Sequence, residues 1–338
     1  MTRATSSTNV LTGFASLVRE HGGDPAAQLR RARIPPSALG DPQARVPVTA
    51  IVRLLEDSAA EIACPDLGLR LSQARRLSHF GLVGKLVRDE PDVRRALQAL
   101  GAWLHLHSEV ILDLQEGGDF AALCFFHGEA AAVASLQVND LVAGGILQVL
   151  RHLLGPGWLP QAVCFEHPAP ADARPYRRYF GCPVEFDGDG NALFLAPADL
   201  ARPLIEADPI FHSESARQVE DWAGLKSRPL KAQVNDLVRV MLPSGRCSIA
   251  NVALRLGLHE RTLRRHLART GLSFSDLLNE ARRETARRYV ERSDKPLAAV
   301  ARMLGFSESS AFSRWFAQNF GSGPREWRER RGRRRRKS

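Results

Sequence analysis

The sequence predicts an α+β N-terminal domain followed by an all-α C-terminal domain, in which a long helix joins two helix-turn-helix units. Three observations lead to this fold class. The spacing of apolar residues changes from helical to alternating near residue 110. A pattern of helix, glycine turn and arginine-bearing helix occurs twice after residue 247. The charge is also divided, since the last third of the chain is basic and the remainder acidic.

Residues 1–125 follow a mostly helical pattern. Thr49 is placed to cap a helix over residues 51–63, because a threonine hydroxyl accepts a hydrogen bond from a free backbone N–H. Pro91 and Asp92 predict the start of another helix, which continues to about His107.

The pattern then alternates. Residues 110–115 and 120–126 flank Gly117 and Gly118 and predict a β-hairpin. Further elements are expected in this order: a long helix from Glu129 to about Leu154, a strand over 160–167, a helix over 175–180, and a second hairpin of residues 184–186 and 192–195 across residues 188–190. Together these elements predict an α+β domain.

The two repeated stretches are residues 248–267 and 297–316. In each, a small residue precedes a glycine by four positions, as Ala253 precedes Gly257 and Ala301 precedes Gly305. The alanine allows two helices to cross closely, and the glycine adopts a turn conformation that other residues reach only at a cost. This is the pattern of a DNA-binding helix-turn-helix, and two in tandem would read a duplex at two places.

Apolar residues recur at helical spacing in both copies, namely Val252, Leu256, Leu263 and Leu267 in the first and Val300, Leu304, Phe312 and Phe316 in the second. The second turn is one residue longer. With that offset Arg265 matches Arg314, Arg261 matches Ser310, and Arg264 matches Ser313. A single such match also fits an ordinary helical hairpin, but two matches with an aligned arginine favour DNA binding.

Between the copies, residues 274–291 predict a helix that Ser275 caps and whose dipole Asp276 complements. About sixteen residues at about 1.5 Å each give a rod of roughly 24 Å. Such a rod suits two recognition helices held roughly 34 Å apart, the distance between successive major-groove faces.

The net charge of +10 conceals an asymmetry. Residues 226–338 contain 27 Lys and Arg against 10 Asp and Glu, a net +17, which leaves −7 for residues 1–225. This division fits a DNA-binding module joined to a part that does not touch DNA. The tail over 330–338 is expected to be disordered, and it either adds salt-sensitive affinity for phosphates or is simply solvated.

No stretch approaches the roughly 18 uninterrupted apolar residues of a membrane span, and the N-terminus lacks a signal-peptide layout. The five cysteines are odd in number and scattered, without a CxxC pattern. They indicate reduced thiols in a cytoplasmic protein, with a redox sensor as the alternative.

His105, His107 and Glu109 suggest a metal site, because residues i and i+2 share one face of a strand. The stretch continues a helical stripe, however, and in a helix i and i+2 diverge. We therefore expect histidines at a helix end and no metal. Neither a catalytic Ser/His/Asp set nor a nucleotide-binding motif is present, so no enzyme and no cofactor are expected.

The C-terminal third resembles the AraC/XylS family of transcription regulators. The resemblance rests on Ala253 with Gly257, residues 261–265, 271–274, 282–286, 301–307 and 310–316, and Gly321, Pro324, Trp327 and Arg328. Residues 77–84, 167–172 and 179–186 resemble the larger, arabinose-binding-type effector domain of one branch of that family. The match covers nearly the whole chain.

The resemblance implies which residues face DNA: Arg261, Arg264 and Arg265 in the first copy, and Ser309, Ser310 and Arg314 in the second. It also implies departures. His259 replaces a capping serine, Glu260 would repel phosphate, Arg283 stands at an apolar position and must snorkel or pair, and Gly323 replaces a serine.

The expected domains are therefore 1–222, an effector-binding or sensor and dimerisation domain; 223–232, a linker; 233–329, the tandem DNA-binding domain; and 330–338, the tail. The expected function is a ligand-responsive, sequence-specific regulator, more an activator than a repressor. Expected partners are double-stranded DNA, RNA polymerase, a small-molecule effector and a second copy of the chain, but no membrane. Two alternatives are an N-terminal domain that is only an interaction platform, and a DNA-repair enzyme, which would need an activated or metal-bound cysteine.

Overall fold

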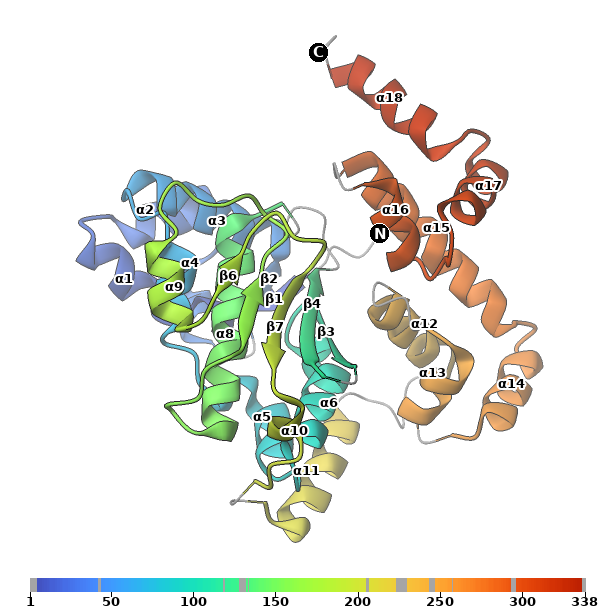
Figure 1. Cartoon of the computed structure of the whole chain (residues 1–338), viewed down its shortest axis with the longest axis horizontal. Coiled ribbons are helices and arrows are strands. Elements are labelled where there is room, and N and C mark those ends of the chain that lie inside the picture. The colour runs from blue at the N-terminus through green and yellow to red at the C-terminus, as the bar shows by residue number, and fades with distance from the viewer. Residues whose placement is uncertain are drawn as a thin grey trace. The chain divides into compact units, whose positions relative to one another are not determined.

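The computed structural model of the chain describes residues 5–41, 44–117, 119–127, 132, 134–204, 207–222, 230–242, 247–256, 258–292 and 296–335. The chain divides into two compact units, Met1–Ala223 and Gly224–Ser338 (Figure 1). Most of the predicted linker lies outside the described residues, and α12 (Leu230–Met241) begins inside its last part.

The first unit is built on a five-stranded sheet in the order β3-β4-β7-β5-β6. The strands are β3 (Val110–Glu116), β4 (Ala121–His127), β5 (Ala162–Cys164), β6 (Val184–Glu185) and β7 (Asn191–Leu195). The predicted β3–β4 hairpin is confirmed, with Val110 opposite His127 and Glu116 opposite Ala121. Of its two turn glycines, Gly118 lies outside the described residues.

The second predicted hairpin is wrong. β7 pairs antiparallel with β4 and β5, whereas β6 pairs parallel with β5 and does not touch β7. The physical reason is burial: Ala192, Leu193 and Leu195 are all buried, so both faces of β7 are covered, as in a central strand. A two-residue strand such as β6 belongs at the edge.

Helices surround this sheet, and several begin at other residues than predicted. α8 spans Leu136–Leu154 rather than starting at Glu129, because the Ser135 hydroxyl caps it by accepting from the Val138 N–H at 3.1 Å. α3 spans Val48–Glu61, so Thr49 lies inside its first turn, after Pro47. α6 spans Val93–Trp103 and is capped by Asp92 as predicted. Its predicted last turn is a 3₁₀ helix, Leu104–Leu106.

The remaining elements of the first unit complete its helical shell: β1 (Thr5–Ser7), α1 (Phe14–Glu20), α2 (Pro25–Arg31), β2 (Arg45–Pro47), α4 (Leu67–Ser72), α5 (Gly81–Arg88), α9 (Arg174–Phe180), α10 (Pro197–Leu200), α11 (Pro209–Trp222), and short 3₁₀ helices η1 (Thr8–Leu11), η2 (Pro36–Gly40) and η3 (Leu77–Phe80). β1 and β2 pair antiparallel as a separate two-stranded sheet.

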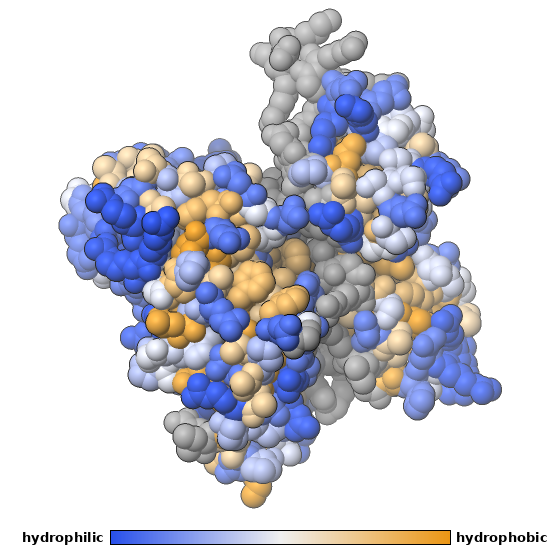
Figure 2. All heavy atoms as spheres, viewed as in Figure 1, coloured by the Kyte–Doolittle hydropathy of each residue, from blue (hydrophilic) through white to orange (hydrophobic). Residues whose placement is uncertain are grey.

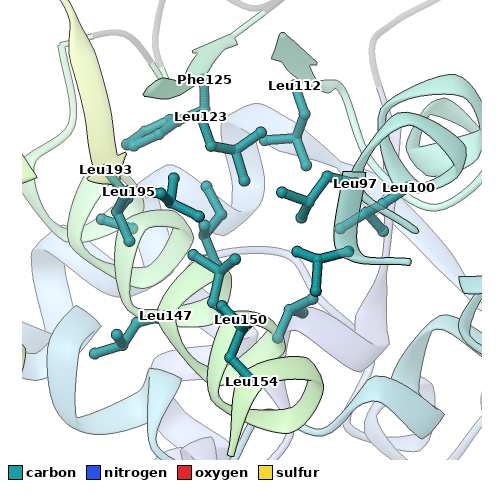
Figure 3. Close-up of a cluster of buried hydrophobic side chains, with 14 of the residues drawn as sticks. Leu97, Leu100, Leu112, Leu123, Phe125, Leu147, Leu150, Leu154, Leu193 and Leu195 are labelled. Atoms are coloured by element: carbon teal, nitrogen blue, oxygen red, sulfur yellow. The ribbon is translucent and has the colours of Figure 1, made fainter. Parts of the chain in front are cut away.

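Two hydrophobic clusters stabilise the first unit, and α8 contributes to both. The larger lies among the sheet, α5, α6 and α8; its leucines, including Leu112, Leu150 and Leu193, point toward one another (Figure 3). The smaller joins α1, α2, α3 and the start of α8. α4 crosses α8 so closely that a Cβ on Gly144 would overlap the Ser72 hydroxyl. This contact ties the two clusters to one helix.

The described residues of the second unit form helices joined by short turns, with no strand among them. It comprises α12, α13 (Ile249–Arg255), α14 (Glu260–Arg269), α15 (Phe274–Arg292), α16 (Leu297–Met303), α17 (Ser309–Phe320) and α18 (Pro324–Arg335) (Figure 1). The long helix α15 contacts α12 on one side and α16, α17 and α18 along the rest of its length. None of the described helices is long and apolar enough to cross a membrane.

Two expectations in this unit need correction. Ser273, not Ser275, caps α15: its hydroxyl accepts from the Asp276 N–H at 3.1 Å and donates to the Asp276 carboxylate at 2.7 Å. The predicted disordered tail is helical up to Arg335, because α18 continues through it. Arginine has a high helix propensity, and extending an existing helix avoids the cost of nucleation.

Candidate DNA-binding surface

The two helix-turn-helix units, α13–α14 and α16–α17, close their first helices in the same way. The Leu258 N–H donates to the Ala253 carbonyl at 2.9 Å, and the Phe306 N–H donates to the Ala301 carbonyl at 3.0 Å. Each bond spans five residues, as in the bond that closes a Schellman turn. Both alanines are only 1% exposed, which supports the prediction that close helix crossing requires a small residue there.

The turns differ by the one residue predicted. Residues 256–259 separate α13 from α14, and residues 304–308 separate α16 from α17. Because the two closing bonds match, the extra residue follows the turn and precedes α17. Gly305 has a φ of +73°, in the left-handed region that favours glycine. Gly257 lies outside the described residues.

Buried apolar side chains anchor both second helices. Leu263 and Leu267 hold α14, and Phe312 and Phe316 hold α17; each is at most 2% exposed. Leu256 was expected in this core but is only half-buried. The faces of α14 and α17 opposite these buried side chains therefore point away from the core.

All six predicted DNA-facing residues are exposed, three on α14 (Arg261, Arg264, Arg265) and three on α17 (Ser309, Ser310, Arg314). Arg261 lies three and four positions before Arg264 and Arg265, and Ser310 lies four before Arg314, so these residues share one face of each helix; Ser309 lies beside Ser310 in the first turn of α17. Arg265 and Arg314 occupy the same position relative to the start of their helices. Figure 2 shows a hydrophilic surface over α14. The structure thus gathers these residues on two outward helix faces.

The arginines of these faces differ in their partners. Arg264 donates to the Glu260 carboxylate from Nε at 2.9 Å and from Nη2 at 2.7 Å. Among the described residues, Arg261, Arg265 and Arg314 take part in no ion pair. On α17 the Ser310 hydroxyl donates to the Glu308 carboxylate at 3.0 Å. An acidic residue near each helix start therefore engages one neighbour, which leaves Arg261 and Arg265 available on α14 and Arg314 on α17.

The N-terminal caps of α14 and α17 reflect the departures from the family pattern that the sequence shows. His259 and Glu308 occupy the N-cap positions of α14 and α17, and neither side chain accepts a capping hydrogen bond. Glu260 lies in the first turn of α14, where its charge suits the helix dipole. Arg283 is exposed on α15, so it is accommodated by solvent.

Sequence reasoning missed two residues of α15 that position the second helix-turn-helix. The Arg282 Nε donates to the Leu304 carbonyl at 2.8 Å, and its guanidinium lies 4.7 Å from the centre of the Phe306 ring. The Trp315 indole N–H donates to the Asn279 side-chain oxygen at 2.7 Å. Arg282 stood in the family pattern, but spacing gave no sign that its partner is the end of α16.

Cysteine chemistry and metal binding find no support in the described part of the chain. Burial is the main cause that raises the pKa of Cys64 and Cys182 to about 11 and of Cys247 to about 12. An activated thiol has a lowered pKa, so these shifts have the opposite direction. No group of three His, Cys, Asp or Glu among the described residues is placed to hold a metal ion.

Comparison with known proteins supplies two family matches. The model described as the arabinose-binding domain of AraC transcription regulator, N-terminal, matches residues 22–204, and a helix-turn-helix domain model matches residues 252–330. The HTH-type transcriptional regulator VirS of Mycobacterium tuberculosis is 33% identical over 322 residues, 94% of each chain. The ornithine utilization regulator of Pseudomonas aeruginosa is 29% identical over 319 residues, 93% of each chain. The transcriptional activator NphR of a Rhodococcus species is 30% identical over 145 residues, 39% of this chain and 43% of that protein.

Proposed function

The chain belongs to the AraC family of transcription regulators, and from this premise we propose that it is a ligand-responsive activator that reads its operator through α14 and α17. That it is a DNA-binding transcription regulator follows from the family. The observation that carries the finer proposal is the pair of unpartnered, exposed arginines, Arg265 and Arg314, at matching positions of two helix-turn-helix units.

The two helix-turn-helix units have unequal roles in this proposal. Arg261, Arg264 and Arg265 face the major groove from α14, where an arginine can grip guanine O6 and N7 with two hydrogen bonds. Glu260 holds Arg264 in one orientation, which favours a defined contact over a diffuse one. α17 offers Arg314 beside Ser309 and Ser310, whose short hydroxyls accept more than one base. The first helix-turn-helix therefore supplies most of the sequence preference.

The N-terminal unit is the sensor. Its support is the family match over residues 22–204, which is described as arabinose-binding. An effector that binds one state of this unit better than another shifts the regulator between its active and inactive states. If the unit were only an interaction platform, no small molecule would raise its melting temperature, and a thermal-shift screen separates the two cases.

RNA polymerase and a second copy of the chain complete the proposed partners. Activation requires contact with polymerase, and the relative NphR is named a transcriptional activator. A dimer would place further recognition helices on the operator. The chain would act in the cytoplasm, where the DNA is. The family consists of regulators, and we propose no enzymatic activity.

Selection of binding sites from a random DNA library tests this proposal. We expect the full chain to select two short elements spaced by about one helical turn. Arg265→Ala should lose the preference at one element, at about 1–3 kcal/mol for a guanine contact, whereas Arg314→Ala should lose less at the other. Arg283→Ala, exposed on α15 outside both recognition helices, is the control. Unchanged selectivity in Arg265→Ala would contradict the assigned role.

A further inference from the structure

A cavity of about 100 Å³ lies inside the first unit, where its two hydrophobic clusters meet. Leu100, Leu112 and Ile146 line it from the larger cluster, and Ile51 and Val138 from the smaller. Closely packed cores contain few voids larger than a water molecule. A cavity lined by residues of both hydrophobic clusters is therefore a place where a small apolar group of a ligand fits.

One cation faces this apolar space without a carboxylate partner. Arg75 lines the cavity and is half-buried. Its Nη1 donates to the Asn9 carbonyl at 2.7 Å, and its guanidinium lies 5.4 Å from the centre of the Phe80 ring. None of the ion pairs between described residues includes Arg75. Burial lowers its pKa to about 10, so it stays charged at neutral pH.

The other titratable groups near Arg75 do not neutralise it. Burial, and then the charges of Arg75 and Arg76, lower the pKa of His79, so this imidazole is neutral at pH 7. Glu109 also lines the cavity, and its charge acts on Arg45, whose pKa it raises against the larger lowering by burial. His127 is hydrogen-bonded to Asn139 at 3.0 Å. A half-buried cation without a counter-ion is partly removed from water at a cost, and a bound anion would lower that cost.

We propose that this cavity binds a small monocarboxylic acid, with its carboxylate on Arg75 and its apolar body between the two clusters. The inference rests on the proposed sensor function and names the ligand class. A sugar would leave most of its hydroxyls unsatisfied against these walls, and the ammonium of a zwitterion would meet one carboxylate, Glu109, whose charge already acts on Arg45. The size sets a limit, because an apolar cavity of about 150 Å³ admits a benzene ring and this one is smaller. A short acid such as butanoate fits best, and a long chain does not.

A carboxylic acid bound in the cavity would strengthen contacts between segments that are distant in the sequence. Asn9 accepts from Arg75 through its carbonyl and donates to the His79 carbonyl from Nδ2 at 3.1 Å. Asn9 belongs to η1, near the N-terminus, whereas Arg75 and His79 lie between α4 and α5. A carboxylate on Arg75 would fix this junction, and so stabilise the ligand-bound state of the sensor.

Isothermal titration of the full chain tests the proposal with straight-chain acids from butanoate to decanoate, 4-methylpentanoate, and the matching primary amides. We expect saturable binding of a short acid, with its amide about 10- to 100-fold weaker because the charge-assisted bonds are lost. Leucine should bind more weakly than 4-methylpentanoate. An amide equal to its acid, tighter binding of leucine, or no binding of any acid overturns the proposal.

Variants locate the site. Arg75→Met should bring the acid down to the affinity of its amide, whereas Arg75→Lys keeps part of the preference and Arg76→Met, at the exposed neighbour, keeps all of it. If Arg75→Met has too low a melting temperature for titration, Arg75→Lys still tests the proposal. Acid and amide affinities that are the same in Arg75→Lys as in the wild type would contradict the pairing of Arg75 with the carboxylate. Binding of Arg75→Met to the selected operator separates the two proposals. If acid binding is absent but the operator is still bound, only the ligand proposal fails and the DNA-binding function stands.

Discussion

A buried acid and a buried histidine face each other in the first unit, and their contact links folding to pH. Asp140 on α8 is fully buried; it accepts from the Tyr176 hydroxyl at 2.7 Å and lies 3.5 Å from the His167 Nε2. Burial raises the pKa of Asp140 despite these hydrogen bonds. Burial is the largest single cause and would lower the pKa of His167. The interaction with Asp140, the hydrogen bond with the Pro168 carbonyl and the charge of Asp187 together outweigh it, so this pKa is raised above 6.5.

The expected result is that stability falls as the pH rises from 6 to 8. A folded-state pKa above the unfolded one contributes stability that is complete below pH 6.5 and is lost as the pH rises through the folded value. Each unit of pKa shift corresponds to about 1.4 kcal/mol, or on the order of 2–4 °C in melting temperature. Melting curves of His167→Gln should be flatter over this range. His152→Gln, exposed on α8, should keep the wild-type slope, and an unaltered slope in His167→Gln would refute the assignment.

At the scale of elements, α15 determines how the second helix-turn-helix is presented. Arg282 reaches the last turn of α16 with a hydrogen bond to Leu304 and a stacked contact on Phe306, and Asn279 holds Trp315 of α17. The first helix-turn-helix instead contacts α12. The spacing of the two recognition helices therefore depends on a few polar contacts made by α15.

Arg282→Lys should lower the melting temperature and weaken binding to the second operator element more than to the first. A lysine ammonium lacks the planar fork that donates to Leu304 while stacking on Phe306, and losing both contacts costs about 1–2 kcal/mol. Footprinting on the selected operator measures the effect. Arg283→Lys, at the exposed neighbour on the same helix, is the control. Equal protection of both elements in Arg282→Lys would show that α15 does not position α17 in this way.

For the whole molecule, charge separates the two units. Residues 226–338 carry a net +17 and residues 1–225 a net −7. The acidic part is repelled by DNA phosphates and the basic part attracted, which favours approach through the second unit. Part of this basic charge lies in residues 330–338, of which the first six form the end of α18.

Deleting residues 330–338 should reduce the salt dependence of DNA binding without changing the selected site. Each lost phosphate contact lowers the slope of log Kobs against log salt by about 0.9. Affinity measured between low and physiological salt, on operator and on unrelated DNA, gives the slope for both. A slope equal to that of the full chain would identify the segment as a solvated extension of α18.

Local patterns carried most of the correct predictions. The two helix-turn-helix units, their extra turn residue, the matched arginines and the β3–β4 hairpin all depend on contacts within about twenty residues. Helical periodicity, glycine turns and buried alanines record such contacts directly. The six residues predicted from spacing and resemblance to face DNA are all exposed, and their contacts with bases stay a prediction.

The class of each segment could be predicted from the amino-acid sequence: two helix-turn-helix units, a basic C-terminal part and an α+β N-terminal part. The neighbours of β7, the cap of α15 and the position of Arg75 at a cavity between two clusters became known from the packing of the fold. The reason is separation along the chain. Asn9, Arg75 and Ile146 meet only after the sheet, α4 and α8 have packed, and no periodicity records a meeting of that kind.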